Sequence, residues 1–190
     1  MKTFIILLRG VMPTGKNKVS MSLLQGALGE AGLENVQTYI QSGNLIASSN
    51  LTQAGIEELV HSTISQKFGG NIPVLARTPQ QFSNILKRVP FQETDTKKLY
   101  FTLLAKNPNK HLLKEFTSID HSPDHIIYEK NVIYTLYNTK HSDSKFNNNY
   151  FERKLKVTMT TRNFNTMNKL IELANAIQKA QAEAQNARST

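Results

Sequence analysis

The spacing of apolar residues predicts six secondary-structure elements in the first part of the chain. Short apolar or alternating runs that end at turn residues predict strands, whereas apolar residues three and four apart predict helices. Ser20 and Thr52 suit helix N-caps, and Gly69 suits a helix end. The predicted order is strand 3–9, helix 21–31, strand 36–40, strand 45–48, helix 52–68 and strand 72–77. This is the order of a ferredoxin-like βαββαβ fold.

The same order recurs in the rest of the chain. The expected elements are a short helix at 79–87, strand 99–105, helix 109–116, strands 125–129 and 132–137 as a hairpin, helix 144–155, strand 157–159 and a closing helix capped by Asn163. The predicted fold class is α+β, with two consecutive ferredoxin-like βαββαβ subdomains and an added C-terminal helix. We expect the subdomains to cover 1–92 and 93–190, because proline and polar residues at 90–95 interrupt the pattern.

Positive charge is concentrated in two parts of the chain. The 190 residues carry 23 Lys and Arg against 14 Asp and Glu, a formal net charge of +9. Lys2, Arg9, Lys16 and Lys18 all precede the first acid, Glu30. The second cluster consists of Lys145, Arg153, Lys154, Lys156 and Arg162, accompanied by Glu152. Such charge attracts polyanions, and it also solubilises an ordinary surface; the sequence favours neither interpretation.

Composition excludes several kinds of site. The chain has no cysteine, which excludes disulfides, thiolate metal sites and cysteine nucleophiles. Pro123 interrupts the spacing of His121 and His125, and the other histidines are dispersed, so we expect no metal site and no cofactor. The apolar run at 4–8 is too short for a signal-peptide core, and no stretch has transmembrane length. We therefore expect a cytoplasmic protein without a membrane partner, of undetermined oligomeric state.

The stretch LLRGVMPTGKNKVSM, residues 7–21, is the main candidate for anion binding. Glycines let backbone N–H groups turn inward, and a helix follows a few residues later. The stretch matches the pattern GxxxxGK, but Asn17 stands where Ser or Thr would hold magnesium, which disfavours nucleotide hydrolysis. A solvated connector and a phosphate-binding loop remain as alternatives. The candidate residues are Arg9, Gly10, Gly15, Lys16, Asn17 and Lys18.

A second candidate is the TTRN segment at 160–163. Arg162 would stand at a helix N-terminus, where backbone N–H groups favour anions and arginine can bind phosphate through two hydrogen bonds. The alternative is that Asn163 or Thr161 only caps the helix, with Arg162 in solvent. Lys145 would occupy a similar position at the start of the preceding helix.

The SGN turn provides two weaker candidates, Ser42 and Asn44. Serine, glycine and asparagine are also what a tight hairpin needs, so we favour a turn over a ligand site. We expect this turn to lie at the opposite end of the sheet from the loop after the first strand, roughly 20 Å away for strands of about six residues. The two segments would then not share one pocket.

Aromatic residues are frequent in the strands of the second subdomain. They could form a stacking surface of the kind that RNA-binding sheets use, but strand aromatics more often belong to the core, and the consensus of that RNA module is absent. These residues are Tyr100, Phe101, Tyr128, Tyr134 and Tyr137.

Four ordered blocks resemble those of one bacterial family. They are the opening stretch at 7–21, TYIQSGN at 38–44, ERKL at 152–155 and TTRNFNT at 160–166. Together they are similar to the domain-of-unknown-function family 1697, DUF1697, over nearly the whole chain. The family usually has Trp where Phe164 stands. The resemblance implies a fold but no established activity.

Two functions of different classes therefore remain. The first is a binding module for a phosphate-bearing ligand, such as nucleic acid or a phosphorylated small molecule, through the basic loop and a helix N-terminus. The alternative is an enzyme acting on a phosphorylated or carboxylated small molecule, although the sequence shows no nucleophile or general base for it.

Overall fold

The computed structural model describes residues 1–12, 14–15, 17–92 and 95–187. By its internal contacts the chain forms two compact units. The first unit comprises Met1–Asn84 with Asn168–Thr190, and the second unit comprises Ile85–Met167. The described residues from Asn168 onward thus group with the first unit, whereas the predicted second subdomain included all residues from 93. Among the described residues, no helix combines the length and the hydropathy needed to cross a membrane.

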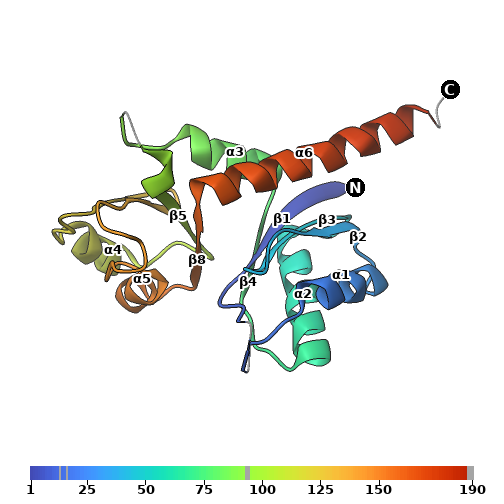
Figure 1. The fold of residues 1–190 in the computed structure, drawn as a ribbon, viewed down its shortest axis with the longest axis horizontal. Helices are drawn as coiled ribbons and strands as arrows, with labels where there is room; N and C mark the ends of the chain where they lie inside the picture. Colours follow the sequence, from blue (N-terminus) through green and yellow to red (C-terminus); the bar gives the residue numbers. More distant parts are fainter. Residues whose placement is uncertain (13, 16, 93–94, 188–190) are drawn as a thin grey trace. The chain divides into compact units, whose positions relative to one another are not determined.

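The first unit contains one antiparallel sheet in the order β2-β3-β1-β4 (Figure 1). This is the ferredoxin-like order, in which β3 lies between the parallel strands β1 and β2. Two helices connect the strands, with Ser20 and Thr52 as the predicted N-caps. The elements are β1 (Lys2–Leu8), α1 (Met21–Glu30), β2 (Glu34–Thr38), β3 (Asn44–Ser49), α2 (Gln53–Phe68) and β4 (Val74–Arg77).

The second unit repeats this arrangement with the sheet order β6-β7-β5-β8. Its elements are the 3-10 turn η1 (Thr96–Lys98), β5 (Leu99–Leu104), α4 (Lys110–Thr117), β6 (His125–Glu129), β7 (Val132–Leu136), α5 (Asn148–Leu155) and β8 (Met159–Asn163). Helix α3 (Pro79–Lys87) precedes it, and α6 (Phe164–Asn186) follows. The predicted fold class of two ferredoxin-like subdomains with an added C-terminal helix is confirmed.

Two boundaries in the second unit differ from the prediction. Helix α5 begins at Asn148 rather than at 144, because Asn147 provides the N-cap and accepts a hydrogen bond from Tyr150 N. Strand β8 covers Met159–Asn163 rather than 157–159, because these residues pair with Tyr100–Leu104 of β5. TTRN is therefore the end of a strand that leads directly into α6.

The sheet of the first unit is buried on both faces. Phe4, Ile6 and Leu8 pack with α1 and α2 on one face, whereas Thr3, Ile5 and Leu7 lie on the other. On that second face, Gln181 of α6 donates to Ser48 Oγ at 2.9 Å and accepts from Thr3 Oγ1 at 3.4 Å. Burial on both faces explains why β1 reads as an uninterrupted apolar run.

The SGN turn lies beside the loop that follows β1, so the sequence expectation of opposite ends is wrong. Leu7 is paired with Asn44, and Leu8 N donates to Gly43 O at 2.8 Å. On the other side of β1, Arg9 N donates to Pro73 O at 2.9 Å. The reason is topological: β2 runs parallel to β1, so the β2–β3 turn returns to the end of the sheet where β1 finishes.

The second unit closes the corresponding end of its sheet with the same bonds. Leu104 N donates to Asn131 O at 3.0 Å, as Leu8 does to Gly43, and Ala105 N donates to Thr158 O at 2.9 Å, as Arg9 does to Pro73. Backbone groups that would otherwise be left unpaired where the central strand ends are thus satisfied by the neighbouring connections in both units.

A histidine is buried in the core of the second unit. His121 is 7% exposed, and its ring lies 5.0 Å from the rings of both Phe116 and Phe146. Its Nε2 has no hydrogen-bond partner among the described residues. Burial lowers the pKa of His121 and the nearby Lys145 and Lys154 add to this, while Asp120 opposes it. The ring is therefore neutral in the folded protein near neutral pH.

Replacing Gly43 with alanine should loosen the SGN turn. A Cβ at this residue would lie 2.7 Å from Leu8 Cβ and 2.9 Å from Val11 Cγ2, and the φ of +76° already disfavours a side chain. We expect the free energy of unfolding to fall by about 2 to 4 kcal/mol in urea titrations. Gly15→Ala is the matched control, because its φ is +80° but nothing lies within 4 Å of the added Cβ. It should cost only about 1 kcal/mol; equal losses in the two variants would contradict the close packing.

The buried histidine should make stability depend on pH. The ordinary value of 6.5 applies to the unfolded chain, while the folded pKa of His121 is lower. Between the two values the unfolded chain binds more protons, so stability falls as the pH drops below 6.5. Urea unfolding at several pH values should show a smaller decline for His121→Phe than for the wild type. His141, whose pKa is also lowered, contributes equally to both proteins. Identical slopes would contradict this account.

Candidate anion-binding site

The loop after β1 is closed by its own backbone bonds. Met12 N donates to Asn17 O at 3.0 Å, and Lys18 N donates to Gly15 O at 3.1 Å. Gly10 has a φ of +76°, which a residue with a side chain rarely adopts. A Cβ on Gly10 would also lie 3.9 Å from Asn17 Nδ2, so the two ends of the loop are close together.

The cationic side chains of this loop differ in exposure. Lys18 is exposed, whereas Arg9 is half-buried, as is the neutral Asn17. Lys16, which belongs to the predicted set, lies outside the described residues. Val19 is 4% exposed and anchors the end of the loop in the core, directly before the N-cap of α1. The exposed Lys18 is therefore attached to a fixed part of the fold.

The SGN turn contributes a rigid neighbour to this loop. Asn44 is fully buried and donates from Nδ2 to Tyr39 O at 3.1 Å and to Ser42 Oγ at 2.9 Å. These are the bonds of a residue that builds a turn. Ser42 is exposed, so of the two weaker candidates it is the one at the surface.

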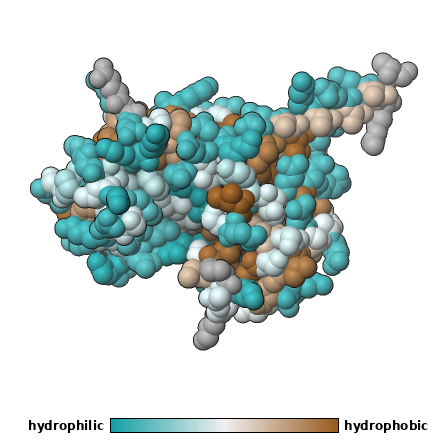
Figure 2. Space-filling view, viewed as in Figure 1, coloured by the Kyte–Doolittle hydropathy of each residue, from teal (hydrophilic) through white to brown (hydrophobic). Residues whose placement is uncertain are grey.

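Three connections thus meet at one end of the first sheet. We call residues 9–20, 39–43 and 69–73 together the basic sheet end. Their sequence includes Arg9, Lys16 and Lys18 but no Asp or Glu. Met12 and Ile40 are also 52% and 53% exposed here. Hydrophobic groups reach the surface of the first unit on the face drawn in Figure 2. The region therefore combines positive charge with exposed aliphatic side chains.

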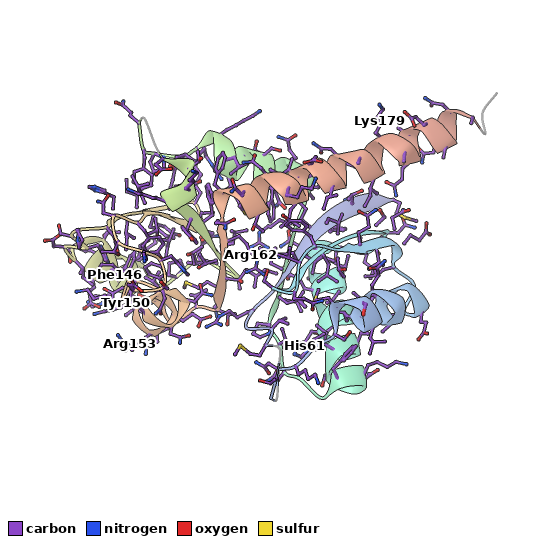
Figure 3. All side chains as sticks on the ribbon, in the orientation of Figure 1. His61, Phe146, Tyr150, Arg153, Arg162 and Lys179 are labelled. Atoms are coloured by element: carbon purple, nitrogen blue, oxygen red, sulfur yellow. The ribbon has the colours of Figure 1, made fainter. Side chains whose placement is uncertain are left out.

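Arg162 and Asn163 both make hydrogen bonds within the second unit. Arg162 is half-buried in β8, and its Nη1 donates to Thr160 Oγ1 and to Thr161 O, each at 2.8 Å (Figure 3). Asn163 Oδ1 accepts from Thr166 N at 2.8 Å and caps the first turn of α6. Asn163 therefore caps the helix, which was the alternative interpretation of this segment. Arg162 donates hydrogen bonds within its own strand.

Lys145 is exposed in the segment that precedes α5. The helix begins only at Asn148, so Lys145 does not stand in its first turn. Its Nζ lies 5.0 Å from the centroid of the Phe146 ring. In α5 itself, Arg153 Cζ is 5.9 Å from the centroid of the Tyr150 ring (Figure 3). Both cations rest against aromatic faces of the second unit.

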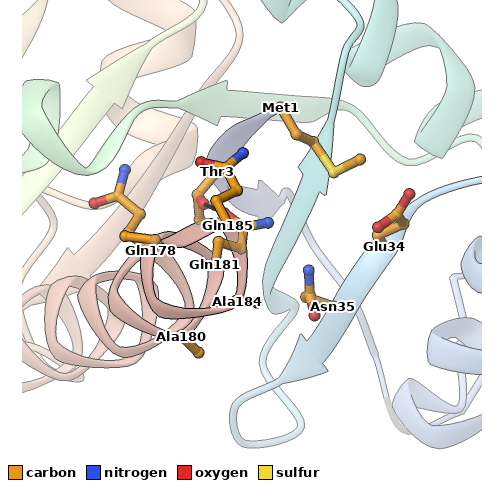
Figure 4. A pocket seen from close by; sticks show the side chains of 10 residues that line it. Met1, Thr3, Glu34, Asn35, Gln178, Ala180, Gln181, Ala184 and Gln185 are labelled. Atoms are coloured by element: carbon orange, nitrogen blue, oxygen red, sulfur yellow. Dashed lines mark hydrogen bonds between the residues drawn. The ribbon is translucent and has the colours of Figure 1, made fainter. Parts of the chain in front are cut away.

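A cavity in the first unit was not foreseen from the sequence. It has a volume of about 580 Å³ and lies between the C-terminal part of α6 and the edge strand β2 (Figure 4). Gln178, Gln181 and Gln185 line it with several alanines, and Glu34 is the one charged side chain among its lining residues. That composition does not suit an anion. Among the described residues, no group of three or more His, Asp or Glu side chains could hold a metal ion.

Comparison with known proteins concerns the fold and the family. The structure of the conserved bacterial protein SP0830 from Streptococcus pneumoniae superimposes with a TM-score of 0.71, covering 90% of this chain and 98% of that chain at 20% identity. At that identity the likeness shows a shared fold alone. No curated protein matches the chain. Residues 1–134 match the family described as protein of unknown function, DUF1697, which confirms the family resemblance and covers the blocks at 7–21 and 38–44. The chain therefore belongs to the DUF1697 family.

Proposed function

We propose that the chain is a binding module for nucleic acid, and that its basic sheet end contacts the phosphate backbone. The observation that carries this proposal is the contact between the SGN turn and the loop after β1. Leu8 N donates to Gly43 O at 2.8 Å, and Gly43 packs so closely on Leu8 and Val11 that no Cβ fits. The SGN turn and the loop after β1 therefore lie against each other in the first unit.

Charge supports a polyanion as the ligand. The sequence of the three segments of the basic sheet end includes Arg9, Lys16 and Lys18 and no Asp or Glu. Val19 and the N-cap Ser20 separate Lys18 from the first residue of α1, whose N-terminal N–H groups add a favourable dipole for anions. Long-range attraction to phosphate follows from such an arrangement and weakens with salt.

Surface shape and hydropathy favour nucleic acid over a small phosphorylated molecule. Met12, Thr14, Gly15 and Lys18 are all exposed in the loop after β1. An open surface suits an extended backbone better than a small ligand, which usually needs an enclosed pocket. The exposed side chains of Met12 and Ile40 offer apolar contacts for bases or sugars.

Removing one cation of the basic sheet end should weaken binding and its salt dependence together. We expect Lys18→Gln to lower affinity for fluorescent RNA and DNA oligonucleotides by about three- to tenfold at low salt in anisotropy titrations. The slope of log K against log salt should become shallower by about 0.7 to 0.9, the contribution of one phosphate contact. The melting temperature should hardly change, because Lys18 is exposed.

Lys179→Gln is the matched control for this experiment. Lys179 is an exposed lysine of α6 in the first unit, and its side chain is 80% exposed beside Glu183 (Figure 3). Lys179 comes two residues before Gln181 in α6. Gln181 contacts Thr3 at the start of β1, whereas the basic sheet end lies where β1 finishes. Its replacement changes the net charge equally but should leave affinity within about twofold. Equal losses in both variants, or no binding by the wild type at low salt, would contradict the proposal.

A further inference from the structure

Two neighbouring hollows lie at the other end of the second sheet, where β5 begins. The first has a volume of about 520 Å³ and is lined by Lys97 and Lys98 of η1 and by residues 137–142. The second, of about 220 Å³, lies against the start of α5. Tyr100 and His141 line both hollows, so a ligand that fills them would lie against this pair of rings.

The two shared rings lie face to face, so each covers one face of the other. Tyr100 and His141 are stacked with centroids 4.5 Å apart and an angle of 4° between their planes. Tyr137 packs edge-on against both, with centroid distances of 5.1 Å to each. Burial lowers the pKa of His141, so the ring is neutral near neutral pH and presents an ordinary stacking face.

The segment that carries His141 is held in place by a buried carboxylate. Asp124 is 5% exposed and accepts hydrogen bonds from Asn138 N at 2.8 Å, from Thr139 N at 3.3 Å and from Ser144 Oγ at 2.8 Å. At the base of the first hollow, Tyr137 N donates to Lys98 O at 3.0 Å. These bonds preorganise the rings and the lysines, which lowers the entropic cost of binding a ligand.

The hollows differ in their polar groups. Lys97, Lys98 and Lys140 are exposed around the first. Asn147 and Asn148 line the second, and each uses its Oδ1 within the protein: Asn147 accepts from Tyr150 N at 3.2 Å, and Asn148 accepts from Thr161 Oγ1 at 2.6 Å. Their Nδ2 groups therefore remain as donors for a ligand. The described residues that line the two hollows include no Asp or Glu.

We propose that these hollows bind one nucleotide unit, with its phosphate at the three lysines, its base stacked on the Tyr100–His141 pair and acceptors of the base or sugar bonded to the asparagines. Lysines suit phosphate, and a planar base gains stacking energy on an aromatic side chain whatever its sequence. The ligand chemistry is the same for a free nucleotide and for the terminal nucleotide of a strand. The site belongs to the second unit and does not depend on the basic sheet end.

The test compares ligands that carry both parts of a nucleotide with ligands that carry one. Calorimetric titration should show binding of adenosine monophosphate, and affinities at least about tenfold weaker for ribose 5-phosphate and for adenosine. A short 5′-phosphorylated oligonucleotide distinguishes the two sources: tighter binding than the mononucleotide assigns the site to a strand end, and equal or weaker binding assigns it to the free nucleotide. Absence of mononucleotide binding up to millimolar concentration would overturn the proposal.

Imidazole proton signals report directly on the site in the wild-type protein. A phosphate bound at the lysines around the first hollow should raise the pKa of His141, which directly follows Lys140 in the chain. The signal of His141 is assigned by its disappearance in His141→Gln. This measurement needs no variant that risks unfolding, and an unchanged His141 pKa at saturating nucleotide would overturn the proposal.

Variants then separate stacking from charge. Tyr100→Leu should weaken nucleotide binding about tenfold and leave ribose 5-phosphate unaffected, while Tyr100→Phe keeps the ring and the affinity. Lys97→Gln should weaken both ligands, and Lys114→Gln, an exposed lysine of α4, should weaken neither. Equal effects of Lys97→Gln and Lys114→Gln would show non-specific charge and contradict the site. Variants of Lys18 in the basic sheet end should not alter mononucleotide binding, so failure here is distinguishable from failure of the proposed function.

Discussion

The contact between Gly43 and the end of β1 is the constraint on which the arrangement of the first unit's loops depends. The bond from Leu8 N to Gly43 O continues the β1–β3 ladder beyond the last paired strand residue, and the packing of Gly43 on Leu8 and Val11 leaves no space for a side chain. A rigid turn is thereby placed against a loop rich in glycine and lysine. Without this contact the basic loop would be an ordinary mobile connector.

The fold explains why such a contact exists in both units. In each sheet, the backbone N–H groups at the end of the central strand need acceptors on both sides. The hairpin turn accepts from Leu8 in the first unit and from Leu104 in the second. The connection to the last strand accepts from Arg9 and from Ala105. The two units differ at the opposite sheet ends. There the second unit carries the Tyr100–His141 stack, whereas in the first unit α6 covers Thr3 and Ser48 through Gln181.

Local patterns were sufficient to predict the elements and the fold class, because caps such as Ser20 and Thr52 and the apolar spacing act within a few residues. They were insufficient where long-range pairing decides. The positions of the SGN turn and of Arg162 depend on which strand lies beside which, and the role of Gln181 depends on a partner 133 residues away. The Tyr100–His141 stack was likewise invisible, because His141 lies in an irregular segment whose path is set by the buried Asp124.

The central claim is that the loop after β1 and the SGN turn form one phosphate-binding surface. Nuclear magnetic resonance titration of the wild-type protein with a short oligonucleotide tests this most directly, because every backbone amide reports separately. The amide signals of residues 9–20, 39–43 and 69–73 should shift together and fit one dissociation constant. Shifts in the loop without shifts in the turn, or no shift in either segment, would contradict the claim.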